Sequence, residues 1–294
     1  TMINQTKVTK NRRAKAQNHQ LLVDQQANIS SRSMLLNLGS RTLDLSKPKI
    51  MGVLNITPDS FSDGGKYQSL DHALSACEKM IDEGASIIDI GGESTKPGSS
   101  PIEAGIQIDR VIPVIQSIKK NFDTIVSVDT GDPVVMREAI KNGAEIVNDV
   151  YALKNTVDMD FLSGENKAIC LMHMKGSPST MQENPVYDDL MTEIKDFLEE
   201  RINFCLRAGK NRESLIIDPG FGFGKTLRHN ILLLKSIEQL KYLEVPICVG
   251  ISRKSFIGKI TNKTINERLY GSLGATLIAI QNGANIIRTH DVGP

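Results

Sequence analysis

The sequence predicts an α/β fold, a (β/α)8 barrel preceded by a short hairpin. From about residue 49 onward, eight short apolar runs rich in Val and Ile alternate with segments of helical period. Most of these runs are apolar at consecutive positions, which is typical of parallel strands covered on both faces. Eight such strands in one series favour a closed parallel barrel over an open doubly wound sheet.

The order of the elements follows from the same pattern. We expect strands at 50–56, 86–91, 124–129, 145–149, 168–173, 215–219, 247–251 and 285–290. Helices are expected near 69–83, 103–120, 133–142, 156–164, 188–208, 228–241 and 267–282. Several of these helices are followed by a glycine, as at Gly84, Gly143 and Gly283. Glycine accommodates a left-handed backbone, so these positions are interpreted as C-caps.

Both ends of the barrel domain carry a specific expectation. Residues 34–45 read as a hairpin around Gly39-Ser40, which could plug the N-terminal mouth of the barrel. After the eighth strand the chain stops at Pro294, so the last helix of this fold is missing from it. Either the chain is trimmed, or something else covers the seam beside the first strand.

Composition bounds the partners and the location. Thirty-five Lys and Arg residues against 34 Asp and Glu leave a formal charge of +1, which gives no global field for nucleic acid or membrane. We divide the chain into a polar extension at 1–33 and a barrel domain at 34–294. The extension lacks the apolar core of a signal peptide, so a disordered or weakly helical tail is favoured over a transit peptide, and we expect a cytoplasmic protein.

The four cysteines are widely spaced in apolar segments, at Cys77, Cys170, Cys205 and Cys248. The spacing contains no C-x-x-C pair and no adjacent histidine. We therefore expect buried, reduced thiols in place of disulfides or a metal site.

Polar residues stand where each expected strand ends, which is where a βα barrel builds its site. The types at these ends suggest a ligand with two parts. Asp129, Asn148, Asp218 and Lys254 could bind a flat heterocycle with both donors and acceptors. Asn55, Arg288 and His290 suit an anion such as pyrophosphate, with a hydrated Mg2+ beside it.

The strand-end motifs resemble those of the dihydropteroate synthase family of pterin-binding enzymes, from about residue 38 to the C-terminus. The motifs are Asn-Ile-Thr-Pro-Asp-Ser-Phe-Ser-Asp-Gly-Gly (55–65), Asp-Ile-Gly-Gly-Glu-Ser-Thr-Lys-Pro-Gly (89–98), Ser-Val-Asp-Thr (127–130), Asn-Asp-Val (148–150), Leu-Met-His-Met (171–174), Asp-Pro-Gly-Phe-Gly-Phe-Gly-Lys (218–225), Ser-Arg-Lys-Ser (252–255) and Arg-Thr-His-Asp-Val (288–292). The first and sixth are long enough to make chance a poor explanation.

The resemblance implies a role for each matched residue. It places Asp129, Asn148, Met172, Asp218 and Lys254 at the pterin, and Asn55, Arg288 and His290 at the diphosphate, with Mg2+ beside Asn55. It places Phe61, Thr95, Lys96, Pro97, Phe223, Ser252 and Arg253 at 4-aminobenzoate. The family usually has Arg at the position of Lys96, so a bidentate contact from that loop is in doubt here. The family also implies a homodimer that forms through the C-terminal helices.

The implied reaction is an alkyl transfer to the amine of 4-aminobenzoate, with loss of diphosphate from a dihydropterin. The residues expected to act in it are Asp129, Asp218, Lys254, Arg288 and His290. Arg288, His290 and Mg2+ would neutralise the leaving group, and the two carboxylates would stabilise the positive charge left on the methylene carbon. The free aryl amine is largely unprotonated at neutral pH, so no general base is assigned.

Other interpretations are weaker. The segment 220–226 resembles a phosphate-binding loop, but Pro219 stands where the Walker pattern requires glycine. His173, between two methionines, is interpreted as a satisfied wall residue. A corrinoid-dependent methyltransferase would share the pterin pocket without needing the first loop and the Arg-Thr-His-Asp cluster. A non-enzymatic pterin binder should have lost some pocket residues.

Overall fold

The computed structural model describes residues 34–56, 66–93, 102–156 and 167–294. Of these, Leu35–Pro294 form one compact unit. The predicted extension at 1–33 lies outside the described residues, as does nearly all of the helix expected at 156–164.

Eight parallel strands form the barrel, as predicted. They are β3 (Lys49–Asn55), β4 (Ala85–Gly91), β5 (Ile125–Asp129), β6 (Ile146–Asp149), β7 (Ala168–Met172), β8 (Leu215–Asp218), β9 (Cys248–Gly250) and β10 (Ile286–Thr289). Their order is β8-β7-β6-β5-β4-β3-β10-β9. A parallel bridge between Ile217 and Ile247 joins β8 to β9, and Ile217 donates its N–H to the carbonyl of Pro246 (2.9 Å). The two ends of the sheet therefore meet.

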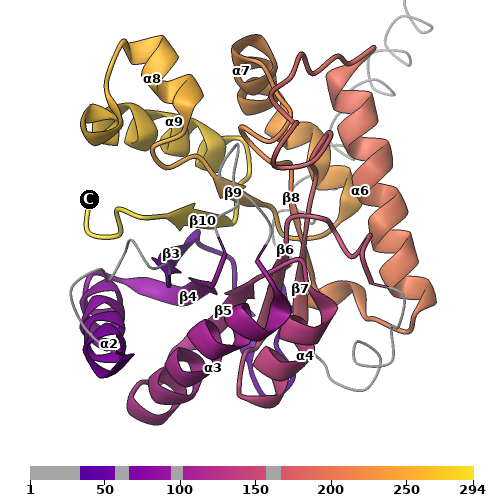
Figure 1. Cartoon of the computed structure of the whole chain (residues 1–294). Helices are drawn as coiled ribbons and strands as arrows, with labels where there is room; N and C mark the ends of the chain where they lie inside the picture. Colours follow the sequence, from indigo (N-terminus) through magenta and orange to yellow (C-terminus); the bar gives the residue numbers. More distant parts are fainter. Residues whose placement is uncertain (1–33, 57–65, 94–101, 157–166) are drawn as a thin grey trace, which may run out of the picture. The chain divides into compact units, whose positions relative to one another are not determined.

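Helices cover the outside of the strands (Figure 1). The α-helices are α2 (Lys66–Asp82), α3 (Ala104–Asn121), α4 (Pro133–Lys141), α6 (Leu190–Arg207), α7 (Leu227–Ser236), α8 (Ser255–Thr261) and α9 (Leu269–Gln281). The described residues also form the 3-10 helices η2 (Arg212–Ser214), η3 (Ile237–Leu243) and η4 (Ile265–Glu267). The glycines after α2, α4 and α9 have φ of +104°, +110° and +108°, which confirms Gly84, Gly143 and Gly283 as C-cap glycines.

Two helix predictions differ from the structure. The single helix expected at 228–241 begins at Leu227 and changes at Ser236, where the backbone (φ −118°, ψ 10°) leaves the α-region and continues as η3. Helix α8 was not predicted. Its seven residues are too few for an apolar period to be recognised, and it ends at Asn262 in a left-handed conformation.

The predicted hairpin is present and lies at the N-terminal ends of the barrel strands. Strands β1 (Leu35–Asn37) and β2 (Thr42–Asp44) pair antiparallel, with a turn in which Gly39 has a φ of +90°. Gly39 donates its N–H to the side chain of Asn37 (2.9 Å). Leu36 and Leu38 are completely buried, so the hairpin covers apolar surface.

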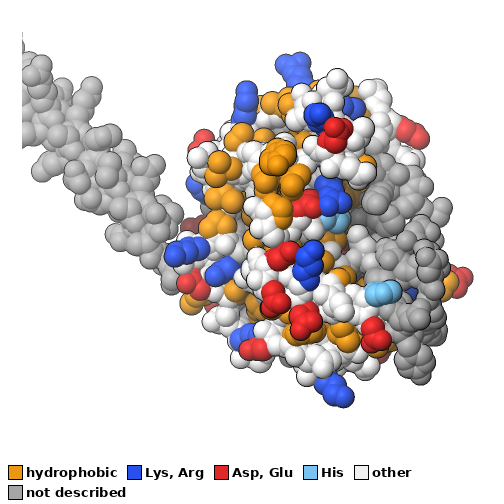
Figure 2. All heavy atoms as spheres, turned by 90° about the vertical axis from the view of Figure 1, so that its left-hand side faces the viewer, with side chains coloured by type: hydrophobic (Ala, Val, Ile, Leu, Met, Phe, Trp, Pro, Cys, Tyr) orange, Lys and Arg blue, Asp and Glu red, His pale blue; other side chains and the backbone are white. Residues whose placement is uncertain are grey.

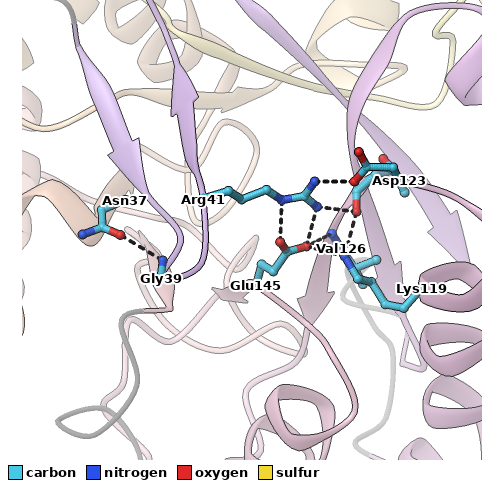
Figure 3. Close-up of polar contacts among 8 residues, drawn as sticks. Asn37, Gly39, Arg41, Lys119, Asp123, Val126 and Glu145 are labelled. Atoms are coloured by element: carbon cyan, nitrogen blue, oxygen red, sulfur yellow. Dashed lines mark hydrogen bonds and ion pairs between the residues drawn. The ribbon is translucent and has the colours of Figure 1, made fainter.

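A cluster of charges fastens this hairpin to the barrel (Figure 3). Arg41 donates to both oxygens of Glu145 (2.6 and 2.9 Å), just before β6, and to the carbonyl of Thr124 (2.6 Å), just before β5. Lys119 of α3 also contacts Glu145 (2.9 Å). Burial alone would raise the pKa of Glu145, but the hydrogen bonds from Arg41 and Lys119 outweigh it and lower that pKa.

The described residues after β10, up to Pro294, form no helix. Instead, the tail passes beside β3, where Val292 is 4% exposed and lies against Gly52 together with Met80 of α2. The side of the molecule on which this tail lies has several apolar side chains at its surface (Figure 2). Helix α9 contributes Tyr270, Leu277 and Ile278, which are 83%, 56% and 44% exposed. The helices in the described part of the chain include none with the length and apolar character of a membrane span.

Candidate active site

Alternate side chains of each strand point into the barrel, and this alternation builds the site. Ile88, Val128 and Ile217 face outward and join the apolar core beneath the helices. Ile87, Ile146 and Ile216 have the opposite parity and are fully buried, but they stand outside that core. Two residues further along these strands, the interior positions become polar, at Asp89, Asn148 and Asp218. The interior is therefore apolar below and polar at its C-terminal end.

A pocket opens at this polar end. Its walls come from six strands, β5 to β10, or the segments that follow them. The lining residues are Asp129, Asn148, Val150, Met172, Asp218, Gly220, Phe221, Phe223, Gly250, Lys254 and Arg288. Because these residues are far apart in the chain, the closure of the barrel brings them together.

The floor of the pocket is a charged network centred on Arg288. Its Nε donates to Asp89 (2.6 Å) and its Nη2 donates to Asp129 (2.6 Å). Asn148 donates its amide to the same oxygen of Asp89 (3.1 Å). The second carboxylate oxygens of Asp89 and Asp129 are buried without a hydrogen-bond partner among the described residues. Buried acceptors that lack a partner are costly, so the unpartnered oxygen of Asp129, which lines the pocket, is suited to a ligand that supplies donors.

Burial changes the acid–base properties of the pocket. It raises the pKa of Asp129 to about 7 despite the opposing effect of Arg288, and the nearby Asp89 adds to the rise. Burial likewise raises the pKa of Asp218, one of whose oxygens accepts the N–H of Gly220 (2.7 Å). Both carboxylates would be more stable beside a positively charged or donor-rich ligand.

Lys254 forms the opposite wall. Its ammonium donates to the carbonyl of Phe221 (2.7 Å) and lies 4.1 Å from the centre of the Phe223 ring. Burial lowers its pKa to about 8, and the carboxylate of Asp218 opposes that shift. The pocket therefore combines two cations, Lys254 and Arg288, with two carboxylates and an aromatic face.

Comparisons with known proteins agree with this geometry. The family model described as "Pterin binding enzyme" matches residues 51–290. Dihydropteroate synthase of Haemophilus influenzae is 46% identical over 259 residues, which cover 88% of this chain and 94% of that protein. The Escherichia coli enzyme is 47% identical over 251 residues, covering 85% and 89%. The chain belongs to the dihydropteroate synthase family.

Solved structures of the family have the same fold. Yersinia pestis dihydropteroate synthase, solved as a complex with a sulfonamide drug, has a TM-score of 0.83 and 45% identity over 88% of this chain and 94% of that chain. The Xanthomonas albilineans enzyme, solved with 4-aminobenzoic acid, has a TM-score of 0.83 and 41% identity over 89% and 94%. The barrel predicted from the sequence is therefore confirmed.

The structure gathers many of the predicted site residues in one pocket. Those that line it are Asp129, Asn148, Met172, Asp218, Phe223, Lys254 and Arg288. Asn55, the last residue of β3, lies beside these residues. Its amide oxygen and a carboxylate oxygen of Asp129 both lie close to Gly91, at 3.4 and 3.7 Å from where a Cβ on that glycine would stand. Phe61, Thr95, Lys96 and Pro97 lie outside the described residues.

Three predicted residues stand at the rim instead of in the pocket. Ser252 contacts the ring of His290 (3.4 Å) and accepts the N–H of that residue (3.3 Å). Arg253 uses its guanidinium in a bidentate ion pair with Asp291. This ion pair links the segment that follows β9 to the segment that follows β10.

Sequence reasoning assigned no role to Asp89, although it stands at a strand end in a motif. The alternation of side chains along β4 could have indicated that Asp89 points into the barrel, as Ile87 does. Which side chains it meets there follows only from the strand register. Asp149, the residue after Asn148, accepts the N–H groups of Tyr151 (2.8 Å) and Leu153 (2.7 Å) and so braces the loop that follows β6.

Proposed function

We propose that this chain condenses (7,8-dihydropterin-6-yl)methyl diphosphate with 4-aminobenzoate to give 7,8-dihydropteroate and diphosphate, a step of folate biosynthesis. One observation carries the proposal: Asp129, Asn148, Asp218 and Lys254 converge with Arg288 at the C-terminal end of one barrel. Family members with the same fold have been solved with 4-aminobenzoic acid and with a sulfonamide drug.

The pterin would occupy the deep part of the pocket. Its 2-amino edge carries parallel N–H groups, which match the two oxygens of a carboxylate such as Asp218. The buried oxygen of Asp129 that lacks a partner would accept a further donor. Asn148 and Lys254 supply donors for the ring nitrogens and oxygen, and Met172 would lie against the ring face.

The diphosphate would lie at the rim. Arg288 keeps two carboxylate contacts at the floor, and its guanidinium fork has further N–H groups for an anion. His290 is exposed at the end of β10 and adds a second donor there.

We further propose that Mg2+ assists at the diphosphate. The described residues include no cluster of three or more His, Cys, Asp or Glu side chains that could hold a metal. Mg2+ commonly binds through one or two protein oxygens, substrate phosphates and waters, so the amide oxygen of Asn55 beside the pocket fits such a site. When bound, the ion would neutralise charge on the diphosphate.

The chemistry breaks the methylene C–O bond and forms a C–N bond to the arylamine. The electron pair of the C–O bond leaves with the diphosphate, beside Arg288 and His290. Asp129 and Asp218 lie where positive charge on the pterin methylene would be stabilised. The amine loses a proton to solvent, and no side chain is assigned as its base.

The arylamine would bind against Phe223, whose ring centre lies 4.1 Å from the ammonium of Lys254. Ser252 and Arg253 would complete this subsite at the rim. Phe61, Thr95, Lys96 and Pro97 are proposed to contribute from the two segments outside the described residues.

Release of diphosphate tests the function. Both substrates are mixed with enzyme, with and without Mg2+, and diphosphate and dihydropteroate are measured. A corrinoid methyltransferase or a pterin-binding protein would release no diphosphate. For the site, Asp218→Ala should abolish pterin binding by calorimetry, and near-normal affinity in that variant would contradict the assignment.

Assembly and location are proposals as well. We propose a homodimer in which the second copy covers the apolar side of α9, because Leu277 and Ile278 are exposed there. Leu277→Glu should shift sedimentation toward monomer, whereas Val134→Glu on α4, 54% exposed, should not. A cytoplasmic location would be tested by cell fractionation.

A further inference from the structure

A short segment between β8 and α7 forms one wall of the pocket. We call residues 220–224 the glycine arch, because Gly220, Gly222 and Gly224 alternate with two phenylalanines. All three glycines have positive φ, of +71°, +78° and +62°. A Cβ at Gly220 would lie 1.9 Å from the carbonyl oxygen of His173. The arch therefore needs glycine both for its conformation and for its close approach to β7.

The arch contacts two residues assigned to the pterin. The N–H of Gly220 donates to Asp218, and the carbonyl of Phe221 accepts from Lys254 (2.7 Å). The ring of Phe223 lies against the same Lys254 ammonium. A movement of the arch would consequently displace the binding groups of the pocket.

A buried lysine holds the underside of the arch. Lys225 is 2% exposed, and its ammonium contacts the carbonyls of Gly220 (2.9 Å) and Phe223 (3.1 Å) and the Nδ1 atom of His173 (2.9 Å). An ammonium has three N–H groups, so these contacts use all of them. They also explain why Lys225 does not serve as the phosphate ligand of a Walker loop.

His173 is built to accept this hydrogen bond. Burial, followed by the charge of Lys225, lowers the pKa of His173 to about 2, so the ring is neutral and one nitrogen can accept. The ring also packs edge-on against Phe197 with centroids 5.1 Å apart, which restricts its orientation. The histidine interpreted as a wall residue is thus the fixed end of the contact.

The two ends of the arch depend on Lys225 to different degrees. Gly220 is held in addition by its N–H bond to Asp218 and by the tight packing against His173. At the other end, the N–H of Gly222 donates to Asn230 (2.8 Å) and the carbonyl of Gly224 accepts from Tyr187 (2.7 Å). The carbonyl of Phe223, which lies between them, accepts from Lys225. Loss of the ammonium should therefore release Phe223 more than it disturbs Asp218.

We propose that Lys225 and His173 form a positioning pair that sets the place of Phe223 in the arylamine subsite. The inference rests on the proposed function, because Phe223 is assigned to that subsite. The pair does not touch substrate, and it acts through the arch.

The test compares Lys225→Met with Lys225→Arg, and His173→Leu with His173→Asn. Asparagine can place an amide oxygen near the position of Nδ1, so it should restore what leucine removes. Lys175→Met is the matched control, because Lys175 lies beside the arch but directs its ammonium to Glu193 (2.7 Å). Each variant is checked for folding by thermal melting, and kcat, both KM values and pterin affinity by calorimetry are measured.

We expect Lys225→Met and His173→Leu to raise KM for 4-aminobenzoate about tenfold or more, with pterin affinity within about threefold of wild type. The arginine and asparagine variants should recover much of the loss. A purely structural role would lower kcat with both KM values unchanged, and that result would overturn the proposal. Equal losses for both substrates would do so too.

Amide hydrogen exchange across 220–226 provides a readout independent of turnover. Faster exchange in Lys225→Met than in wild type and Lys175→Met supports the positioning pair, even if wild type releases no diphosphate. In that case the proposed function fails on its own. Unchanged exchange, with an active wild type and an unchanged KM for 4-aminobenzoate, would refute the pair.

Discussion

Arg288 donates its Nε to Asp89 over 2.6 Å, although the two residues are 199 positions apart in the chain. Asp89 is completely buried and also accepts from Asn148. It thus joins a residue proposed to bind diphosphate to one proposed to bind the pterin. Asp89 is itself absent from the pocket lining, so its contribution to the reaction is to hold these two side chains in place.

Replacing this carboxylate should impair both substrate sites. Asp89→Asn keeps the shape but removes one of the two negative charges beside Arg288, and the new amide would oppose that of Asn148. We expect kcat/KM for the pterin substrate to fall by about 10- to 100-fold, measured in steady state. Ser127→Ala is the control, since Ser127 is the register partner of Asp89 and its buried hydroxyl has no partner in the described chain. Equal activity of Asp89→Asn and wild type would contradict the assignment.

The charge cluster under the hairpin should stabilise the barrel in a pH-dependent way. Glu145→Gln removes the buried carboxylate that Arg41 and Lys119 share, and Arg41 keeps its ion pair with the exposed Asp123. We expect a cost of about 3 kcal/mol in the free energy of unfolding near pH 7. Glu138→Gln, which affects an exposed pair with Lys141, should cost less than about 0.5 kcal/mol. Chemical denaturation measures both.

The sign of the pH effect follows from the lowered pKa of Glu145. A carboxyl group whose folded pKa lies below its usual value of 4.5 stabilises the fold above that pH and loses this effect as the pH falls through the folded pKa. The unfolding free energies of wild type and Glu145→Gln should therefore converge in acid. A gap that stays constant below pH 4.5 would show that the carboxylate charge is not the cause.

The glycine arch predicts a contrast between two glycine-to-alanine changes. Gly220→Ala places a methyl group 1.9 Å from the His173 carbonyl, so the backbone must shift, and we expect a loss of about 3 kcal/mol or more together with pterin binding. Gly84→Ala also has positive φ but meets nothing within 4 Å, so it should cost about 1–2 kcal/mol and leave binding intact. Thermal melting and pterin calorimetry would distinguish the two.

The four cysteines should be unreactive in the folded protein. Burial raises the pKa of Cys77 to about 12 and that of Cys205 to about 11, and a hydrogen bond with Cys248 together with burial raises the pKa of Cys170. An aromatic disulfide reagent at pH 8 should titrate four thiols only after unfolding. Rapid modification of even one thiol in the native protein would show that a strand or helix opens.

Much of the architecture could be predicted because apolar runs and glycine caps are local signals. The strands at 168–173 and 215–219 differ from β7 and β8 by one residue at the C-terminal end. Local signals failed where an element was short, as for α8, or where the helix type changed along one apolar pattern, as after Ser236. The hairpin could be predicted from its Gly-Ser turn, but the ion pair between its Arg41 and Glu145 could not be predicted.

The apolar runs and the residues that follow them were enough to predict that eight parallel strands end in polar side chains, and therefore that a pocket forms where those strands end. Which of these side chains contact one another is set by the folded chain. Arg288 meets Asp89 and Asp129, Arg253 turns to Asp291, and Lys225 meets His173. The physical reason is that such pairs depend on strand register and barrel closure, which bring together inward-facing residues far apart in the chain.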